Sequence, residues 1–122
     1  MSAADHLGPQ YAHMRGRMKA KDLVNLPSYE FNFTPFSQVK GGLEGFVEAS
    51  KEPESVAEWD LQDPYDNLYD HIKANGVRQA VHVQPMDGGM YQLMDGHHRV
   101  ASAYDIDPEM QVPVYFGATK VV

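Results

Sequence analysis

Residues 93–101, Leu-Met-Asp-Gly-His-His-Arg-Val-Ala, are the most informative stretch of this sequence. An apolar, strand-like run ends at Gly96, and a helix-compatible run follows at once. The first turn of a helix leaves backbone N–H groups unpaired at the positive end of the helix dipole, where an anion binds readily. Gly96 has no Cβ, so an anion can approach its backbone closely. The stretch therefore predicts a strand–turn–helix unit that binds phosphate.

The side chains after Gly96 suit phosphate oxygens. Arg99 carries a planar, permanently charged fork, and His97 and His98 donate hydrogen bonds, more strongly when protonated. Asp95 is expected either to cap the helix or to hold a metal-bound water, and it is the candidate magnesium residue. By spacing alone, a surface turn followed by a capped helix explains the same residues.

The flanking sequence predicts strands joined by turns. A strand with one buried face is expected over residues 28–33, where aromatic and polar residues alternate. The turn Asp87-Gly88-Gly89 predicts a hairpin between a strand around Val81 and Val83 and a returning strand over residues 90–94. A last strand is expected over residues 112–116.

Helices are expected between these strands. Apolar residues recur at helical spacing around residues 43–47, and Asp63 and Gly76 are good signals for the start and end of a second helix. A third helix is expected over residues 98–104. The element order predicts an α+β (mixed α/β) fold in one domain, with a small mixed sheet and flanking helices. We assign residues 1–20 to a basic N-terminal arm and residues 21–122 to the domain.

Charge is unevenly distributed along the chain. The net charge is −7, yet residues 1–27 hold four bases, Arg15, Arg17, Lys19 and Lys21, against two acids. These four bases are the candidate DNA contacts. Residues 44–70 hold nine acids and one base. This acidic face repels a nucleic-acid backbone and is either a solvated surface or a site for a protein partner.

Composition narrows the class of protein. The sequence has no cysteine, which excludes disulfides, thiolate metal sites and a cysteine nucleophile, and which fits a reducing cytoplasm. No apolar run approaches the roughly 20 residues of a membrane span, and no signal-peptide pattern is present. We therefore expect a cytoplasmic protein that does not enter a membrane. A homodimer is an open alternative, because the sequence does not indicate the oligomeric state.

Residues 66–116 resemble the ParB N-terminal domain, also called the ParB-like nuclease domain, of the ParB/sulfiredoxin-like fold. The resemblance rests on three segments in order: Asn75-Gly76 followed by Gln79 and a strand, then Asp95-Gly96-His97-His98-Arg99, then Val112-Pro113-Val114. It implies a nucleotide whose phosphates lie on residues 96–99, with Gln79 bordering the pocket and magnesium accompanying the nucleoside di- or triphosphate. Members of this fold include CTP-dependent DNA-partition proteins, sulfiredoxins and a free-serine kinase.

The sequence departs from each of these branches. It lacks the sulfiredoxin cysteine, it has histidines where partition proteins carry glutamate and arginine, and it ends where their helix-turn-helix domain would begin. The Asp-Gly-His-His-Arg motif is closer to that of the kinase-like branch. That branch also needs a carboxylate from the N-terminal region, and Glu30 and Glu44 are the candidate catalytic bases. Three functions stay open: a nucleotide-binding protein of phage or plasmid type acting on or beside DNA, a small-molecule phosphotransferase, or a protein-interaction module.

Overall fold

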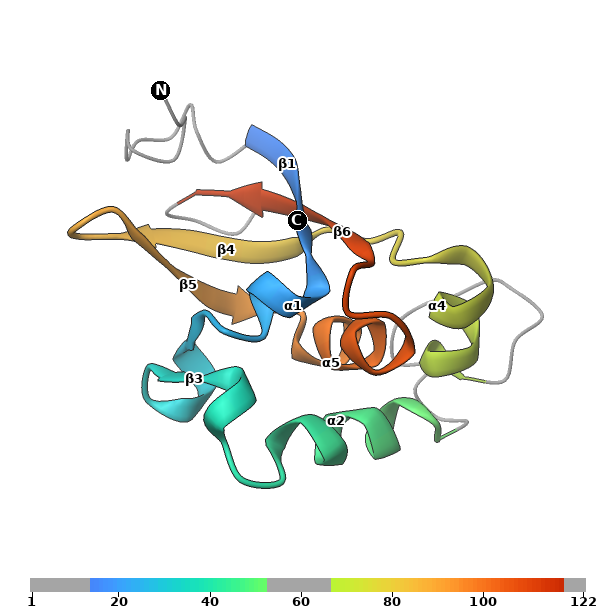
Figure 1. Ribbon diagram of the computed structural model, residues 1–122. Coiled ribbons are helices and arrows are strands. Elements are labelled where there is room, and N and C mark those ends of the chain that lie inside the picture. Colours follow the sequence, from blue (N-terminus) through green and yellow to red (C-terminus); the bar gives the residue numbers. More distant parts are fainter. Residues whose placement is uncertain (1–13, 53–66, 118–122) are drawn as a thin grey trace.

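The structure, a computed structural model, describes residues 14–52 and 67–117 (Figure 1). Its strands are β1 (Met14–Lys19), β2 (Pro27–Ser28), β3 (Thr34–Pro35), β4 (Val81–Met86), β5 (Met90–Asp95) and β6 (Gln111–Phe116). Its α-helices are α1 (Ala20–Leu23), α2 (Gly42–Ser50), α4 (Leu68–Asn75) and α5 (His97–Ile106). Two short 3-10 helices, η3 (Tyr29–Phe31) and η4 (Phe36–Gln38), lie between β2 and α2. The expected α+β fold is confirmed.

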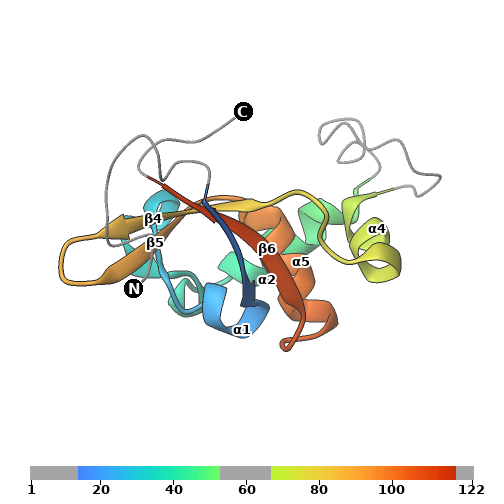
Figure 2. The same cartoon turned by 90° about the horizontal axis from the view of Figure 1, so that it is seen from above.

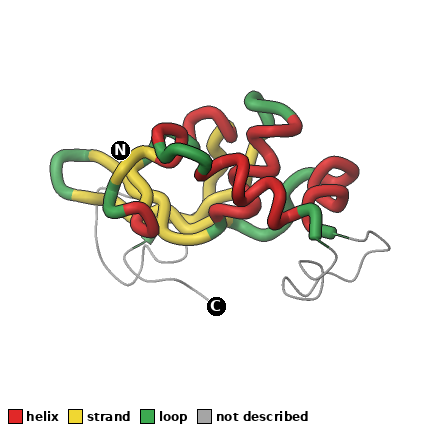
Figure 3. Tube along the Cα trace, turned by 90° about the horizontal axis from the view of Figure 1, so that it is seen from below, coloured by secondary structure: helices red, strands yellow, loops and turns green. Residues whose placement is uncertain are grey.

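The six described strands form one mixed sheet in the order β1-β6-β4-β5-β2-β3. The pairs β6–β4 and β5–β2 are parallel, and the other three neighbouring pairs are antiparallel. Helices α2, α4 and α5 lie on one side of the sheet (Figures 1 and 2), and Figure 3 views the molecule from that side. The fold is therefore a layer of helices against one face of a sheet.

The hydrophobic core lies between the sheet and α5. Val81 and Val83 of β4 and Val112 and Val114 of β6 point to the helices and are completely buried, as is Val100 of α5. Alternate strand residues point to one face, so each strand contributes every second residue to this core. The core fixes α5, and with it the start of α5 directly after β5, in relation to the sheet.

The predicted strand over residues 28–33 is wrong. Only Ser28 of that stretch is in a strand, residues 29–31 form η3, and Asn32 and Phe33 have positive φ angles of 55° and 66°. These left-handed residues reverse the chain, so that β3 turns back to pair with β2. Tyr29 and Phe33 are exposed and only Phe31 packs against the core, so the alternation of aromatic residues did not mark a buried strand face.

The expected arm over residues 1–20 contains a strand. Met14–Lys19 form β1, which pairs antiparallel with β6 along its whole length, from Met14 opposite Phe116 to Lys19 opposite Gln111. Gly16 disfavours a helix but is compatible with an edge strand. A Cβ added at Gly16 would lie 3.0 Å from the ring of Phe116 on β6. Residues 1–13 lie outside the described part of the chain.

Other local signals agree with the structure. The hairpin turn has positive φ angles at Gly88 and Gly89, and the helices expected at residues 43–47 and 98–104 correspond to α2 and α5. The proposed N-cap Asp63 lies outside the described residues; α4 instead has Asn67 as its N-cap, which accepts from Asp70 N at 2.8 Å. None of the helices in residues 14–52 and 67–117 is long and apolar enough for a membrane span.

Candidate functional site

A pocket of about 430 Å³ opens beside α2, and we call it the α2 pocket. Its walls come from η3, the segment before α2, one side of α2 and the start of α5. Three of its lining side chains are polar: Glu30, Lys40 and His98. The others are apolar or glycine: Phe31, Val39, Gly41, Gly42, Gly45, Phe46 and Ala49. Such a mixture of a mainly apolar wall and a few convergent polar groups is typical of small-molecule sites.

The start of α2 forms the positively charged end of this pocket. Its N-cap, Gly41, has φ +73° and no side chain with which to cap the first turn. The first-turn N–H groups of a helix lack intrahelical acceptors and lie at the positive end of the dipole. Lys40 precedes this glycine and adds an exposed ammonium group. Lys40 is not among the site residues predicted from the sequence, where its only signal is a lysine before two glycines that begin a helix.

Gly96, at the start of α5, is needed for packing. Its φ is +105°, and a Cβ at this position would lie 2.5 Å from Cγ1 of Val81. Real Cβ atoms do not approach other atoms so closely, so only glycine lets the turn after β5 pass over β4. The sequence predicted a close approach of the Gly96 backbone to an anion; the structure shows a close approach to a core side chain.

His97 is buried and has polar neighbours on both ring nitrogens. Its Nε2 lies 2.6 Å from Oγ of Ser28, and its Nδ1 lies 3.3 Å from Oε2 of Glu30. The ring packs among the aromatic rings of Phe36 and Phe46, whose centroids are 5.1 Å and 5.7 Å away. Burial lowers the pKa of His97, and the charge of Glu30 only partly opposes this effect. Burial therefore favours the neutral form of the His97 ring.

His98 faces the α2 pocket. It is partly exposed, and its ring meets the Phe46 ring edge-on at a centroid distance of 4.7 Å. Adjacent helical residues point about 100° apart, which explains why one histidine enters the core and the next reaches the pocket. Asp95, at the end of β5, is also partly exposed, and its charge opposes the lowering of the pKa of His97 and of Arg99.

Arg99 points to the other side of α5. It is buried, and its Nη1 donates to the backbone carbonyls of Ala80 at 3.0 Å and Gln79 at 3.4 Å. Burial lowers its pKa, and the Asp95 charge opposes the shift. Arg99 and Gln79 line a cavity of about 20 Å³ beside α4, away from the α2 pocket. Arg99 thus holds the chain that leads into β4, and a phosphate contact by either residue stays a prediction.

The structure separates the two candidate bases. Glu30 is in η3, its side chain is 55% exposed, and it reaches both His97 and the α2 pocket. Glu44 is on α2 and lines a different cavity of about 210 Å³, together with Tyr104 and Asp105 of α5. Glu30 is therefore the candidate that lies with the histidines of residues 96–99.

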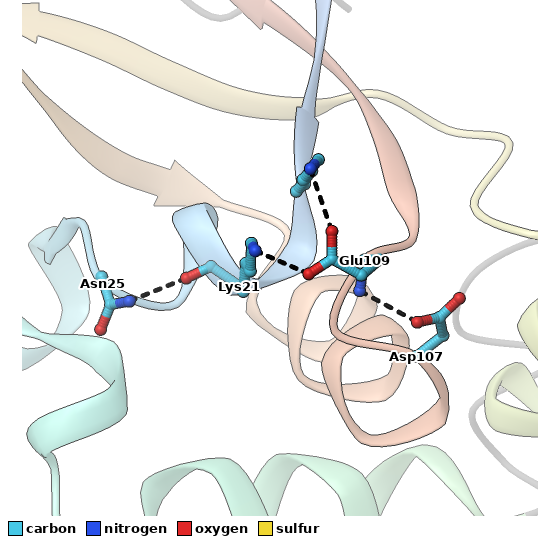
Figure 4. A network of polar contacts seen from close by, with 5 residues as sticks. Lys21, Asn25, Asp107 and Glu109 are labelled. Atoms are coloured by element: carbon cyan, nitrogen blue, oxygen red, sulfur yellow. Dashed lines mark hydrogen bonds and ion pairs between the residues drawn. The ribbon is translucent and has the colours of Figure 1, made fainter.

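Ion pairs involve two of the four predicted DNA contacts. Glu109 lies between Lys19 and Lys21, with Nζ–Oε distances of 3.0 Å and 2.6 Å. Figure 4 shows its contact with Lys21. A hydrogen bond from Lys21 is the largest cause of the lowered pKa of Glu109. The Arg15 guanidinium lies over the Tyr115 ring, 4.8 Å from its centroid, and Arg17 is exposed on β1. The four bases stand on β1 and α1 rather than on a separate arm.

In residues 14–52 and 67–117 no group of three or more histidine, aspartate or glutamate side chains is arranged to hold a metal ion. Magnesium in nucleotide sites needs fewer protein ligands, because phosphates and water complete its octahedral shell. Comparison with protein-family models, with curated proteins and with solved structures finds no match.

Proposed function

We propose that this protein binds the phosphates of a nucleotide in the α2 pocket. One observation carries the proposal: Lys40, His98 and the start of α2, which its glycine N-cap leaves without a side-chain cap, meet at one pocket of about 430 Å³. Two potential cations and a helix N-terminus together form a suitable environment for phosphate oxygens. The resemblance to ParB/sulfiredoxin-like proteins supports the same class of ligand and assigns the phosphates to residues 96–99.

The rest of the pocket suits the non-phosphate part of a nucleotide. Phe31, Val39 and Phe46 provide an apolar wall with two aromatic rings. Aromatic rings favour stacked or edge-on contact with other flat rings, so a nucleobase fits this wall. The volume lies within the range of roughly 300–1,000 Å³ that small-molecule sites occupy.

Glu30 at the same pocket is compatible with phosphate if a cation accompanies the ligand. A carboxylate repels phosphate oxygens, whereas magnesium is commonly held by one or two carboxylates together with phosphates. Glu30 lines the pocket and would be the residue that holds the ion there. Asp95 ends β5 outside this lining, so its role with magnesium stays a prediction. Magnesium would neutralise charge on the phosphates.

Glu30 also favours a second candidate function, a small-molecule phosphotransferase. A general base must come within hydrogen-bond reach of the acceptor hydroxyl, and the Glu30 carboxylate lies at the pocket, where an acceptor could reach it. We rank binding without fast turnover first, because the described residues show no second group positioned to orient an acceptor. Turnover that disappears in Glu30→Gln, with affinity retained, would establish the phosphotransferase instead.

A role on or beside DNA, as in phage or plasmid proteins, is the broader setting that we propose. It rests on the resemblance and on Arg15 and Arg17, which are exposed on β1. Lys19 and Lys21 contribute less, because Glu109 neutralises part of their charge. Such binding would be weak and salt-sensitive.

A thermal-shift screen tests the proposed ligand. ATP, ADP, CTP and GTP are each added with and without magnesium, since a ligand selective for the native state raises the melting temperature. Calorimetry on Lys40→Ala then tests the site: we expect affinity for the best nucleotide to fall about three- to tenfold, as for loss of one exposed charge contact. Lys73→Ala, an exposed lysine on α4 outside the pocket, is the matched control. Equal affinities in both variants, or no stabilising nucleotide, would reject the proposal.

A further inference from the structure

We propose that His97 and Ser28 are positioning residues: together they hold the Glu30 carboxylate at the mouth of the α2 pocket, and His97 itself makes no contact with phosphate. The two adjacent histidines then have different tasks, with His98 facing the ligand and His97 orienting a neighbouring acid. The inference rests on the proposed function only for the role that Glu30 has at the pocket. The contacts of His97 with Ser28 and Glu30 are independent of that function.

Three elements converge on the His97 ring. Ser28 comes from β2 and is completely buried, Glu30 comes from η3 and is 55% exposed, and His97 begins α5 with a 4% exposed side chain. Ser28 lies opposite Leu93 in the parallel β2–β5 pair, so the sheet itself fixes the serine. Phe31, Phe36 and Phe46 surround the ring with centroid distances of 5.1–6.1 Å and limit its rotation.

The two contacts favour one tautomer of the His97 ring. An ionised carboxylate only accepts hydrogen bonds, so the nitrogen facing Glu30, Nδ1, must bear the hydrogen. A neutral ring then has a bare Nε2, which accepts from the hydroxyl of Ser28 at 2.6 Å. Besides Glu30, the charged groups nearest to the ring are Asp95 at the end of β5 and His98 on α5. The tautomer with its hydrogen on Nδ1 therefore satisfies both contacts at once, with Ser28 donating to the ring and Glu30 accepting from it.

This connectivity resembles that of a hydrolytic triad, but the exposure is reversed. In a triad the serine meets the substrate, and the acid is buried behind the histidine. Here the serine is completely buried and the acid lies at the pocket. Ser28 cannot reach a substrate as a nucleophile, so the functional end of this chain of contacts is the Glu30 carboxylate.

Side-chain nitrogen NMR at pH 7.5 tests the arrangement in the free protein. We expect His97 to have a protonated Nδ1 and a bare Nε2, and we expect this preference to weaken in Ser28→Ala and in Glu30→Ala. Glu44→Ala, which removes the other candidate acid on α2, should leave the His97 tautomer unchanged. A protonated Nε2 in the wild type, or a tautomer insensitive to both Ser28→Ala and Glu30→Ala, would overturn the proposal.

Binding of magnesium-ATP, used as the probe, tests whether the arrangement reaches the pocket. Ser28 is buried and does not line the pocket, so a simple structural role predicts that Ser28→Ala leaves affinity unchanged. We expect Ser28→Ala to weaken binding about threefold in the wild type and to have no further effect when Glu30 is already alanine, as for residues acting through one another. Additive effects would overturn the positioning role. If neither magnesium-ATP nor any other nucleotide of the thermal-shift screen binds the wild type, the proposed function is rejected, while the NMR result would still decide the arrangement.

Discussion

Helices α2 and α5 begin in the same way and use their first residues differently. Each has a glycine N-cap in the left-handed region, Gly41 with φ +73° and Gly96 with φ +105°. The start of α5 carries the residues that the sequence predicts for phosphate, yet most of them contact the protein itself. The start of α2 carries no recognised motif, yet Lys40 and Gly41 line a pocket of about 430 Å³.

The difference shows that a motif specifies a backbone turn more firmly than it specifies where its side chains go. At α5 the turn lies between β4 and the helix layer, so Gly96 meets Val81 and Arg99 meets the carbonyls that precede β4. At α2 the turn lies at the surface, where nothing lies within 4 Å of a Cβ built on Gly41. Whether each turn is buried or at the surface therefore determines whether its residues contact the protein core or line a pocket.

The two N-cap glycines should therefore differ most in stability. We expect Gly96→Ala to destabilise the fold by about 2–5 kcal/mol, because a left-handed backbone and a clash with Val81 add together. Gly41→Ala has the left-handed cost without the clash, about 1–2 kcal/mol. Urea denaturation of both variants measures the difference. Equal losses would show that the Val81 contact relaxes and that the two helix starts are equivalent.

Arg99→Ala should come next in size. Its two backbone hydrogen bonds are made by a buried charged group, and their loss should lower the free energy of unfolding by about 2–3 kcal/mol. If Arg99 also binds phosphate, nucleotide affinity falls as well when calorimetry is done at a temperature at which the variant is folded. A variant that loses stability and keeps its affinity would assign Arg99 to the fold alone.

Gly45→Ala should change stability and binding in opposite directions. Gly45 lies within α2 and lines the pocket, and a Cβ there would meet no atom within 4 Å. Alanine should stabilise the helix by about 0.5–1 kcal/mol, whereas its methyl group occupies space in the pocket and weakens nucleotide binding. Glu48→Ala raises helix propensity on the same helix without adding an atom to the pocket. A parallel change in melting temperature and affinity in Gly45→Ala would contradict the site.

The smallest effect is expected from the ion pairs of Glu109, away from both helix starts. Its pKa is lowered from 4.5 in the folded protein, so its stabilising contribution is present above pH 4.5 and is lost as the pH falls through the lowered value. The pKa of Lys21 is raised from 10.5, so its contribution is lost at alkaline pH. Glu109→Gln should flatten the acid limb of a melting-temperature profile and leave nucleotide affinity unchanged.

The same variant tests the DNA contacts. Because Glu109→Gln releases Lys19 and Lys21, any binding of duplex DNA should become tighter at low salt. Weaker or unchanged binding would remove these lysines from the DNA interface.

Elements with strong local signals could be predicted from the sequence. The Asp87-Gly88-Gly89 turn needs two positive φ angles, which glycine adopts at little cost, and the hairpin follows from this. Residues 28–33 could not be predicted, because Phe33 adopts a left-handed conformation that its residue type disfavours and that the β2–β3 pairing maintains. Nothing within those six residues indicates that pairing.

The candidate site was only partly predictable for a related reason. Residues 95–99 mark where the site lies, because the turn and the helix start are local. The Ser28–His97 contact joins residues 69 apart in the sequence, and only the parallel β2–β5 pair brings them together. Helix geometry requires His97 and His98 to point in different directions. It does not say which of them faces the core, since that depends on the packing of α5 beneath the sheet.

The pairing of β1 with β6 constrains how this chain reaches its native state. The first described strand can form its hydrogen bonds only after the last one exists, since Met14 lies opposite Phe116. The paired residues of β1 and β6 are about one hundred positions apart in the sequence, so this contact is highly non-local. During synthesis the β1 residues leave the ribosome long before the β6 residues with which they pair. We therefore expect the β4–β5 hairpin, whose contacts are local, to form early, and the β1 edge to close late in folding.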